Sequence, residues 1–291
     1  MTEAKAKAVA ITRAQGMRFM LICALCDGSV GTLIKLLPWN PFVIAGFRGA
    51  LASSLLFVYY RRSGIKLKVS LRSLLAGCMI SAMFISFIVA TKLTSAGNAV
   101  ALQFCYPIFI VLLSFLIFKR KPALREILMT MGVIAGIALV FGGSLTAEGM
   151  PGNILALFSG LCLAGMLLFN NRVRDPAEHY AALVLGHLIT FLASIYFFAA
   201  AFPTFTVQST LAILALGIVQ QAVTNILYAY AIRVCEPLTC ALISMLQLAI
   251  NPVLVYFAIG ESLSAVGASG CAVILAVSVA AIVHEQKTSI G

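Results

Sequence analysis

Long apolar runs separated by short polar connections fill almost the whole chain. Each run has about 20 residues, the length of helix that crosses ~30 Å of hydrocarbon. Lipid offers no partner for a free amide, and the runs lack the period-2 alternation of a membrane barrel, so helices are predicted. The ten predicted spans are residues 17–35, 41–60, 71–91, 96–118, 123–143, 151–171, 180–201, 207–232, 238–259 and 263–284.

Ten spans divide into two sets of five, and a duplicated half with an odd number of spans would insert upside down. Gln103 and Pro107 in the fourth span correspond, with one residue of slippage, to Gln247 and Pro252 in the ninth. The expected fold is therefore an all-α membrane protein of ten transmembrane helices in two inverted five-helix repeats. The expected regions are an N-terminal segment (1–16), the first repeat (17–143), the second repeat (150–284) and a C-terminal tail (285–291).

Composition supports a membrane protein and excludes most soluble functions. Apolar residues make up 62% of the 291 positions and charged residues only 10%, whereas a soluble domain has about 25% charged residues. The net charge is +11, but the basic residues form short clusters between apolar runs, which argues against nucleic-acid binding. The expected partner of this charge is the surface of the lipid bilayer.

Lysine and arginine predict the orientation in the membrane, because they favour cytoplasmic connections. With the N-terminus inside, 17 of the 20 fall in cytoplasmic segments. Lys35, Arg48 and Lys92 are left for the membrane and the outer side. Both termini are therefore expected in the cytoplasm. A cleavable signal peptide is the competing interpretation, but the first span is long for one and has no A-x-A site.

Four titratable residues fall within or near the ends of predicted spans. Asp27 and Arg48 would each cost roughly 2.5–3.5 kcal/mol to insert unless paired or hydrated. Their expected depths are similar, so they could form a structural ion pair, or Asp27 could bind substrate or protons. Lys35 could extend to the outer surface or bind a substrate carboxylate. His187 could titrate near neutral pH or pack through hydrogen bonds.

Amide and tyrosine side chains form stripes at helical spacing on three spans. Such stripes either join helices by hydrogen bonds or line a hydrated cavity, where amides would bind an amino acid and aromatic rings would cover its apolar part. The candidate substrate-binding residues are Gln103, Tyr106, Gln221, Asn225, Tyr228, Gln247 and Asn251. Pro107 and Pro252 could act as hinges for alternating access, or they could form static kinks.

Two motifs in the first two spans resemble the drug/metabolite transporter superfamily, and within it the EamA-type ten-helix exporters. They are Gly28-Ser29 followed by Leu33-Ile34-Lys35, and Pro41 followed by Ala45-Gly46-Phe47-Arg48. Where the family usually has tryptophan before the glycine, this chain has Asp27. The general appearance is similar to YddG-type exporters of aromatic amino acids.

The resemblance implies a secondary transporter in the bacterial inner membrane that exports amino acids or similar small amphipathic metabolites without a cofactor. Spans 1, 3, 4, 6, 8 and 9 would surround the substrate. A broader drug or metabolite exporter driven by proton antiport is the alternative within this class. The number of subunits stays open, with a monomer among the options.

An intramembrane enzyme is the alternative from another class. Gly267-Ala268-Ser269-Gly270 matches the G-x-S-G of intramembrane serine proteases. Ser269 is expected about 9 Å from the outer face and His187 about 10 Å from the inner face, too far apart for a nucleophile and its base. Cys23 and Cys26 have C-x-x-C spacing but no second ligand pair. We therefore expect neither an enzyme nor a metal site.

Overall fold

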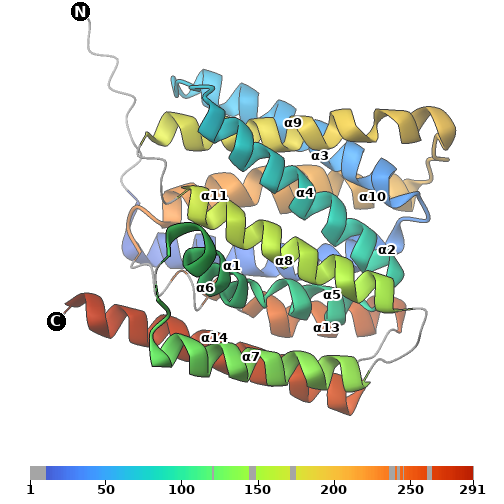
Figure 1. The fold of residues 1–291 in the computed structure, drawn as a ribbon. Coiled ribbons are helices and arrows are strands. Elements are labelled where there is room, and N and C mark those ends of the chain that lie inside the picture. Colours follow the sequence, from blue (N-terminus) through green and yellow to red (C-terminus); the bar gives the residue numbers. More distant parts are fainter. Residues whose placement is uncertain are drawn as a thin grey trace, which may run out of the picture.

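A computed structural model describes residues 11–119, 121–143, 149–170, 175–235, 240, 243–244, 246–260 and 264–290, and the regular elements among them are helices (Figure 1). The first part of the chain holds α1 (Arg13–Gly28), α2 (Val30–Leu36), α3 (Pro41–Arg62), α4 (Leu71–Leu93), α5 (Ala96–Gln103), α6 (Tyr106–Phe118) and α7 (Leu124–Gly143). The second holds α8 (Met150–Asn170), α9 (Pro176–Ala200), α10 (Val207–Leu214), the π-helix η1 (Ala215–Val223), α11 (Thr224–Ala231), α13 (Leu246–Ile259) and α14 (Ala265–Ile290).

Within the described residues, seven helical segments are long and apolar enough to cross a membrane. Three shorter apolar helices lie at Ile127–Leu139, Leu246–Ile259 and Ala265–Val277. Each of these segments falls within or overlaps one of the predicted spans, in the same order. The helical membrane fold is therefore confirmed, whereas ten crossings and the inverted repeat stay predictions.

Polar side chains at the helix starts explain several of the boundaries. Thr12, Ser70 and Thr206 form capping boxes at the starts of α1, α4 and α10. Asn40 and Asp175 accept hydrogen bonds from the first turns of α3 and α9, each of which begins with proline. These oxygens satisfy backbone N–H groups that have no partner within the helix, so the polar connections define where the apolar helices begin.

Three predicted spans contain a break or a change of helix type. The first divides at Ser29, whose hydroxyl donates to the carbonyl of Cys26 at 2.7 Å. The fourth divides at Phe104 and Cys105, just before Pro107 in the first turn of α6. Proline has no N–H and its ring clashes with the carbonyl four residues earlier, which explains this division. The eighth changes to a π-helix at η1, whereas Pro252 lies inside the unbroken α13.

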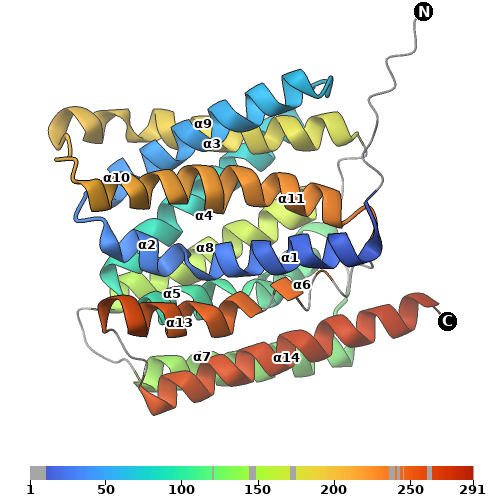
Figure 2. The same cartoon turned by 180° about the vertical axis from the view of Figure 1, so that it is seen from behind.

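The helices of the two parts pack in matched pairs. α3 lies beside α9, and α7 lies beside α14 at the edge of the bundle (Figures 1 and 2). α4 packs on α8 as α1 packs on α11, and α4 packs on α9 as α3 packs on η1. If each of spans one to five is exchanged with the span five positions later, the pairs α3–α9 and α7–α14 map onto themselves. The other pairs map onto one another in the order given. The packing has the pattern expected of a duplicated half.

Glycines allow the closest of these helix contacts. A Cβ atom on Gly49 of α3 would lie 2.6 Å from the backbone carbonyl oxygen of His187 on α9. A Cβ atom on Gly165 of α8 would meet only the flexible side chain of Met79, 3.4 Å away. Small residues let backbones approach in membranes, where packing rather than the hydrophobic effect joins helices. The α3–α9 contact therefore requires glycine at position 49. The contact between α4 and α8 has room for a larger residue at Gly165.

We expect Gly49→Ala to destabilise the protein by about 1–3 kcal/mol, because backbone atoms must separate to accommodate the methyl group. Gly165→Ala is the matched control, and its stability should be unchanged or slightly higher, since alanine favours helix. Thermal unfolding of the detergent-solubilised variants measures both. Equal melting temperatures for the two variants would contradict the close α3–α9 packing.

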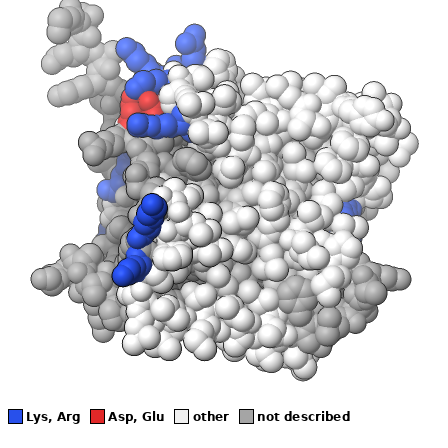
Figure 3. Space-filling view, in the orientation of Figure 1, with Lys and Arg blue, Asp and Glu red and all other residues white. Residues whose placement is uncertain are grey.

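Charge is concentrated at one end of the bundle, here called the basic end, where α1 begins and α14 ends (Figure 3). It includes the connections after α3 and α6, with Arg61, Arg62, Lys66, Lys68, Arg72, Lys119 and Lys121. The opposite end holds Lys35 and Lys92 in the last turns of α2 and α4. Between the ends, many large apolar side chains are exposed. This belt suits contact with lipid rather than water.

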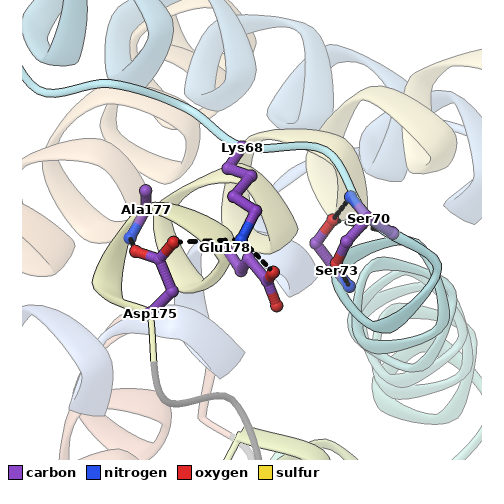
Figure 4. Close-up of polar contacts among 6 residues, drawn as sticks. All are labelled: Lys68, Ser70, Ser73, Asp175, Ala177 and Glu178. Carbon is purple, nitrogen blue, oxygen red and sulfur yellow. Dashed lines mark hydrogen bonds and ion pairs between the residues drawn. The ribbon is translucent and has the colours of Figure 1, made fainter.

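Lys68 connects the segment between α3 and α4 to the start of α9 (Figure 4). Its ammonium group lies 3.3 Å from Oδ2 of Asp175 and 3.0 Å from Oε1 of Glu178. Its backbone N–H also donates to the carbonyl of Ala177 at 3.1 Å. Hydrogen bonds from the Ala177 N–H and then from Lys68 lower the pKa of Asp175. Hydrogen bonds to the two carboxylates raise the pKa of Lys68.

We expect Lys68→Met to lower the melting temperature slightly at pH 7, because these exposed groups are screened by water. The folded pKa of Asp175 lies below its unfolded value, so its stabilisation is present above about pH 4 and is lost as the pH falls through the folded pKa. The difference from the unmodified protein should therefore shrink on acidification below about pH 4. Lys66→Met, at an exposed lysine of the same segment, is the control and should show no such trend in thermal unfolding.

Candidate functional site

A cavity of about 270 Å³ lies among the helices of both parts of the chain, and we call it the central cavity. Its polar lining residues are Asp27, Arg48, Gln103, Gln220, Gln221, Thr224, Asn225, Tyr228, Ser244 and Gln247. Its remaining lining residues are Cys23, Val30, Met83, Phe84, Phe87, Val100, Phe104 and Leu163. The volume lies just below the roughly 300–1,000 Å³ of most small-molecule sites, so the cavity suits a small metabolite.

Two consecutive glutamines of η1 hold the two charged residues of the cavity. Gln220 donates from Nε2 to Oδ1 of Asp27 at 3.1 Å. Nη2 of Arg48 donates to Oε1 of Gln221. Arg48 is buried, with only 3% of its surface exposed. One turn of helix from the second part of the chain thus binds a carboxylate on α1 and a guanidinium on α3.

Asp27 and Arg48 do not form the direct ion pair that the sequence suggested as their structural role. Both residues are described, and each binds a different glutamine instead of the other. The glutamine side chains supply hydrogen-bonding groups on both sides of the gap. Two opposite charges therefore face one cavity without contacting each other.

Aromatic rings form the apolar wall of the central cavity. Phe84, Phe87 and Phe104 all line it. The guanidinium carbon of Arg48 lies 4.4 Å from the ring centroid of Phe84, a cation–π contact. His187 also stacks on Phe84, with ring centroids 5.0 Å apart, and is 1% exposed. His187 lies outside the cavity lining, in a packing position.

Five of the amide and tyrosine residues predicted as substrate ligands do line the cavity. Gln103 donates to the hydroxyl of Ser159 at 2.7 Å, and Asn225 donates to the carbonyl of Gln221 at 2.7 Å. Tyr228 is 46% exposed and Gln247 is partly exposed. The structure thus brings these five residues together in the lining of one cavity.

Two other predicted ligands lie elsewhere. Asn251 is fully buried and donates from Nδ2 to the carbonyl of Gly28 at 3.0 Å, so it joins α13 to the end of α1. A Cβ atom on Gly31 would lie 2.6 Å from the same amide nitrogen, which shows how tightly this contact is packed. Tyr106, at the start of α6, is not among the lining residues. Both positions therefore differ from the predicted substrate contacts.

The end opposite the basic end is closed by two lysines and an aromatic cluster. Lys35 of α2 donates to the carbonyl of Thr94 at 2.8 Å, and Lys92 of α4 donates to the carbonyl of Leu37. Each lysine thus binds a carbonyl at the end of the other helix. Trp39 packs edge-on against Phe205, with centroids 4.9 Å apart, and is 6% exposed.

The central cavity lies between the basic end and the lysines of the opposite end. Its lining residues on the first span run from Cys23 to Val30, on the basic side of Lys35. Lys35 therefore contacts protein at the opposite end and not the cavity.

The comparisons with known proteins agree with this architecture. Residues 14–142, from α1 to α7, match the model of the EamA-like transporter family. The matched residues are similar to an EamA-like transporter domain. A solved crystal structure of another protein aligns with a TM-score of 0.65 at 16% identity, covering 95% of this chain and 99% of that chain. That likeness shows a shared fold. No curated protein matches this chain in sequence.

The region similar to the EamA-like family contributes Asp27, Arg48 and Gln103 to the central cavity. That family is one of transporters, and seven described helical segments of this chain are long and apolar enough to cross a membrane. The G-x-S-G motif lies in α14. Ser269 lies exposed on α14 and donates to the carbonyl of Val266 at 2.7 Å, whereas His187 is buried beside Phe84.

Gln220 is the main site residue that the sequence analysis missed. Helical spacing of 3.6 residues per turn groups Gln221 with Asn225 and Tyr228 and turns Gln220 away from them. In the structure, Gln220 lies in the π-helix η1 and lines the cavity as well. Such turns are frequent at functional sites. Two adjacent glutamines in an apolar span were the only signal available.

We expect Gln220→Met to destabilise the protein by about 1–3 kcal/mol, because the half-buried carboxylate of Asp27 would lose its amide donor. Gln103→Met removes a hydrogen bond to a neutral hydroxyl and should cost less, about 0.5–1.5 kcal/mol. Chemical or thermal unfolding in detergent compares the two variants. A larger loss for Gln103→Met would argue against the Gln220–Asp27 interaction.

Proposed function

We propose that this EamA-like protein is a secondary transporter that exports amino acids, mainly aromatic or other apolar ones, or similar small amphipathic metabolites. The observation that carries the proposal is the central cavity, which is lined by charged and amide groups together with phenylalanines. An apolar pocket with a few convergent polar groups is typical of a small-molecule site. A ligand with one polar and one apolar end would find partners for both.

The proposed architecture has ten crossings in two inverted five-helix repeats. The matched packing of α3 with α9 and of α7 with α14 supports it, because both pairs join equivalent spans. The basic end would face the cytoplasm of a bacterial cell, since lysine and arginine favour that side of the inner membrane. Substrate would then enter the cavity from the cytoplasm, as an exporter requires.

Alternating access would use the breaks in the helices around the cavity. The division at Ser29 and the division before Pro107 interrupt two of the lining spans, and Pro252 removes a hydrogen bond within a third. In transporters, such discontinuous helices are found at the substrate site near the middle of the membrane. Outward opening would separate α2 from α4 at Lys35 and Lys92.

A metabolite exporter driven by proton antiport is the second candidate, favoured by one observation. Asp27 is a carboxylate that faces the central cavity from within a membrane span. Intramembrane carboxylates commonly carry protons in transporters. Transport that depends on a pH gradient in the assay below would support this candidate.

We expect the purified protein in proteoliposomes to show saturable counterflow of apolar amino acids. Tyr228→Ala and Gln247→Ala should each change the relative uptake of phenylalanine and leucine by about tenfold or less, the effect of one or two contacts. Tyr196→Ala, at a tyrosine that is 75% exposed outside the cavity, is the control and should leave the preference unchanged. Melting temperatures would check that all three variants fold. Unsaturable flux would indicate a channel instead.

A further inference from the structure

Arg48 has hydrogen-bonding capacity that the protein does not use. Its Nε and Nη1 atoms are buried, and neither has a hydrogen-bond partner. Only Nη2 is bonded, to the neutral amide oxygen of Gln221. A guanidinium carries five N–H donors, and leaving buried donors of a charged group unpaired is costly. The protein alone therefore leaves N–H donors of the Arg48 cation without a hydrogen-bond acceptor.

No carboxylate of the described residues forms an ion pair with Arg48. Asp27 is the acidic residue that shares the central cavity with it, and Asp27 binds Gln220 instead. The face of Phe84 offers Arg48 a weaker partner at 4.4 Å. A buried cation of this kind needs an anion with oxygen acceptors to complete its hydrogen bonds.

Asp27 has hydrogen-bond acceptor capacity that the protein does not use. Oδ1 accepts from Gln220 at 3.1 Å, while no described residue donates to Oδ2. A carboxylate has acceptor sites for several donors, so this group can still accept from an ammonium group. The cavity thus offers an acceptor at Asp27 and donors at Arg48.

The glutamines of η1 are the hydrogen-bond partners of these two charges. Gln220 binds Asp27 and Gln221 binds Arg48, so each charge contacts a neutral amide rather than the opposite charge. A ligand that carries only an ammonium group would leave Arg48 without an anion. A ligand that carries only a carboxylate would leave Asp27 without a cation. A ligand with both charges would pair with each.

We propose that the central cavity is a zwitterion site, in which Arg48 binds the carboxylate and Asp27 binds the ammonium group of an apolar α-amino acid. The side chain of the ligand would lie against Phe84, Phe87 and Phe104. This assignment rests on the proposed transport function and names the chemical class of its substrate. It makes Arg48 and Asp27 the residues that separate amino acids from plain amines and plain acids.

The test compares three ligands that share one phenyl ring. Phenylalanine has both charges, phenethylamine lacks the carboxylate, and 3-phenylpropanoate lacks the ammonium group. Each is measured as an inhibitor of phenylalanine counterflow in proteoliposomes and as a thermal stabiliser of the full-length protein in detergent. We expect phenylalanine to be at least about tenfold more potent than either analogue, which corresponds to ~1.4 kcal/mol. An analogue as potent as phenylalanine would overturn the proposal.

Variants then assign each charge to its residue. Arg48→Gln should abolish the advantage of phenylalanine over phenethylamine but keep its advantage over 3-phenylpropanoate. Asp27→Asn should do the reverse. Arg61→Gln, at an exposed arginine of the basic end, is the control and should keep both advantages. Retention of both advantages in Arg48→Gln would exclude Arg48 as the carboxylate ligand.

The design separates failure of this inference from failure of the proposed function. If phenylalanine or leucine shows saturable counterflow while the two analogues compete equally well, the transporter stands and the zwitterion site is wrong. If neither amino acid is transported or stabilises the protein, both are wrong. Should Arg48→Gln not fold, Arg48→Lys keeps the positive charge and should retain part of the preference over phenethylamine. The ligand comparison on the unmodified protein needs no variant.

Discussion

The cost of keeping two opposite charges inside a helix bundle determines the geometry of the central cavity. A buried charge in a membrane span must find partners within the protein or in a hydrated cavity. Direct pairing of Asp27 with Arg48 would neutralise both charges, and neither charge would then be available to bind a ligand. The glutamines of η1 instead stabilise each charge separately with one hydrogen bond. The bundle thereby holds a dipolar site ready, in a setting where water competes weakly.

The two glutamines that hold these charges lie in the π-helix η1. Adjacent residues of a helix point in different directions, about 100° apart in an ordinary α-helix. Gln220 binds α1 and Gln221 binds α3, so two neighbouring side chains reach two different helices. One turn in the second part of the chain thus connects two helices of the region that is similar to the EamA-like family.

The sequence predicted what depends on hydrophobicity and spacing, and it failed where side chains choose partners. The helical membrane class and the approximate positions of the helices followed from the length of the apolar runs. Helical spacing also brought Gln221, Asn225 and Tyr228 to one face. Asn251 looked equivalent to them, yet it binds the carbonyl of Gly28 because that helix contact is too close for a cavity. Neither the π-helix nor the separation of Asp27 from Arg48 has a sequence pattern from which to predict it.

The two ends of the bundle differ in a way that suits a carrier. At the opposite end, Lys35 and Lys92 bind carbonyls at the ends of each other's helices, so α2 and α4 are joined by charge-assisted hydrogen bonds. Carbonyl partners can be exchanged for water at the membrane surface at little cost. These two contacts are therefore replaceable on opening, whereas in the proposed zwitterion site the charges at the centre depend on the ligand for completion. Opening at this end would then leave the Asp27 and Arg48 contacts with the ligand as the interactions that remain to be broken on release.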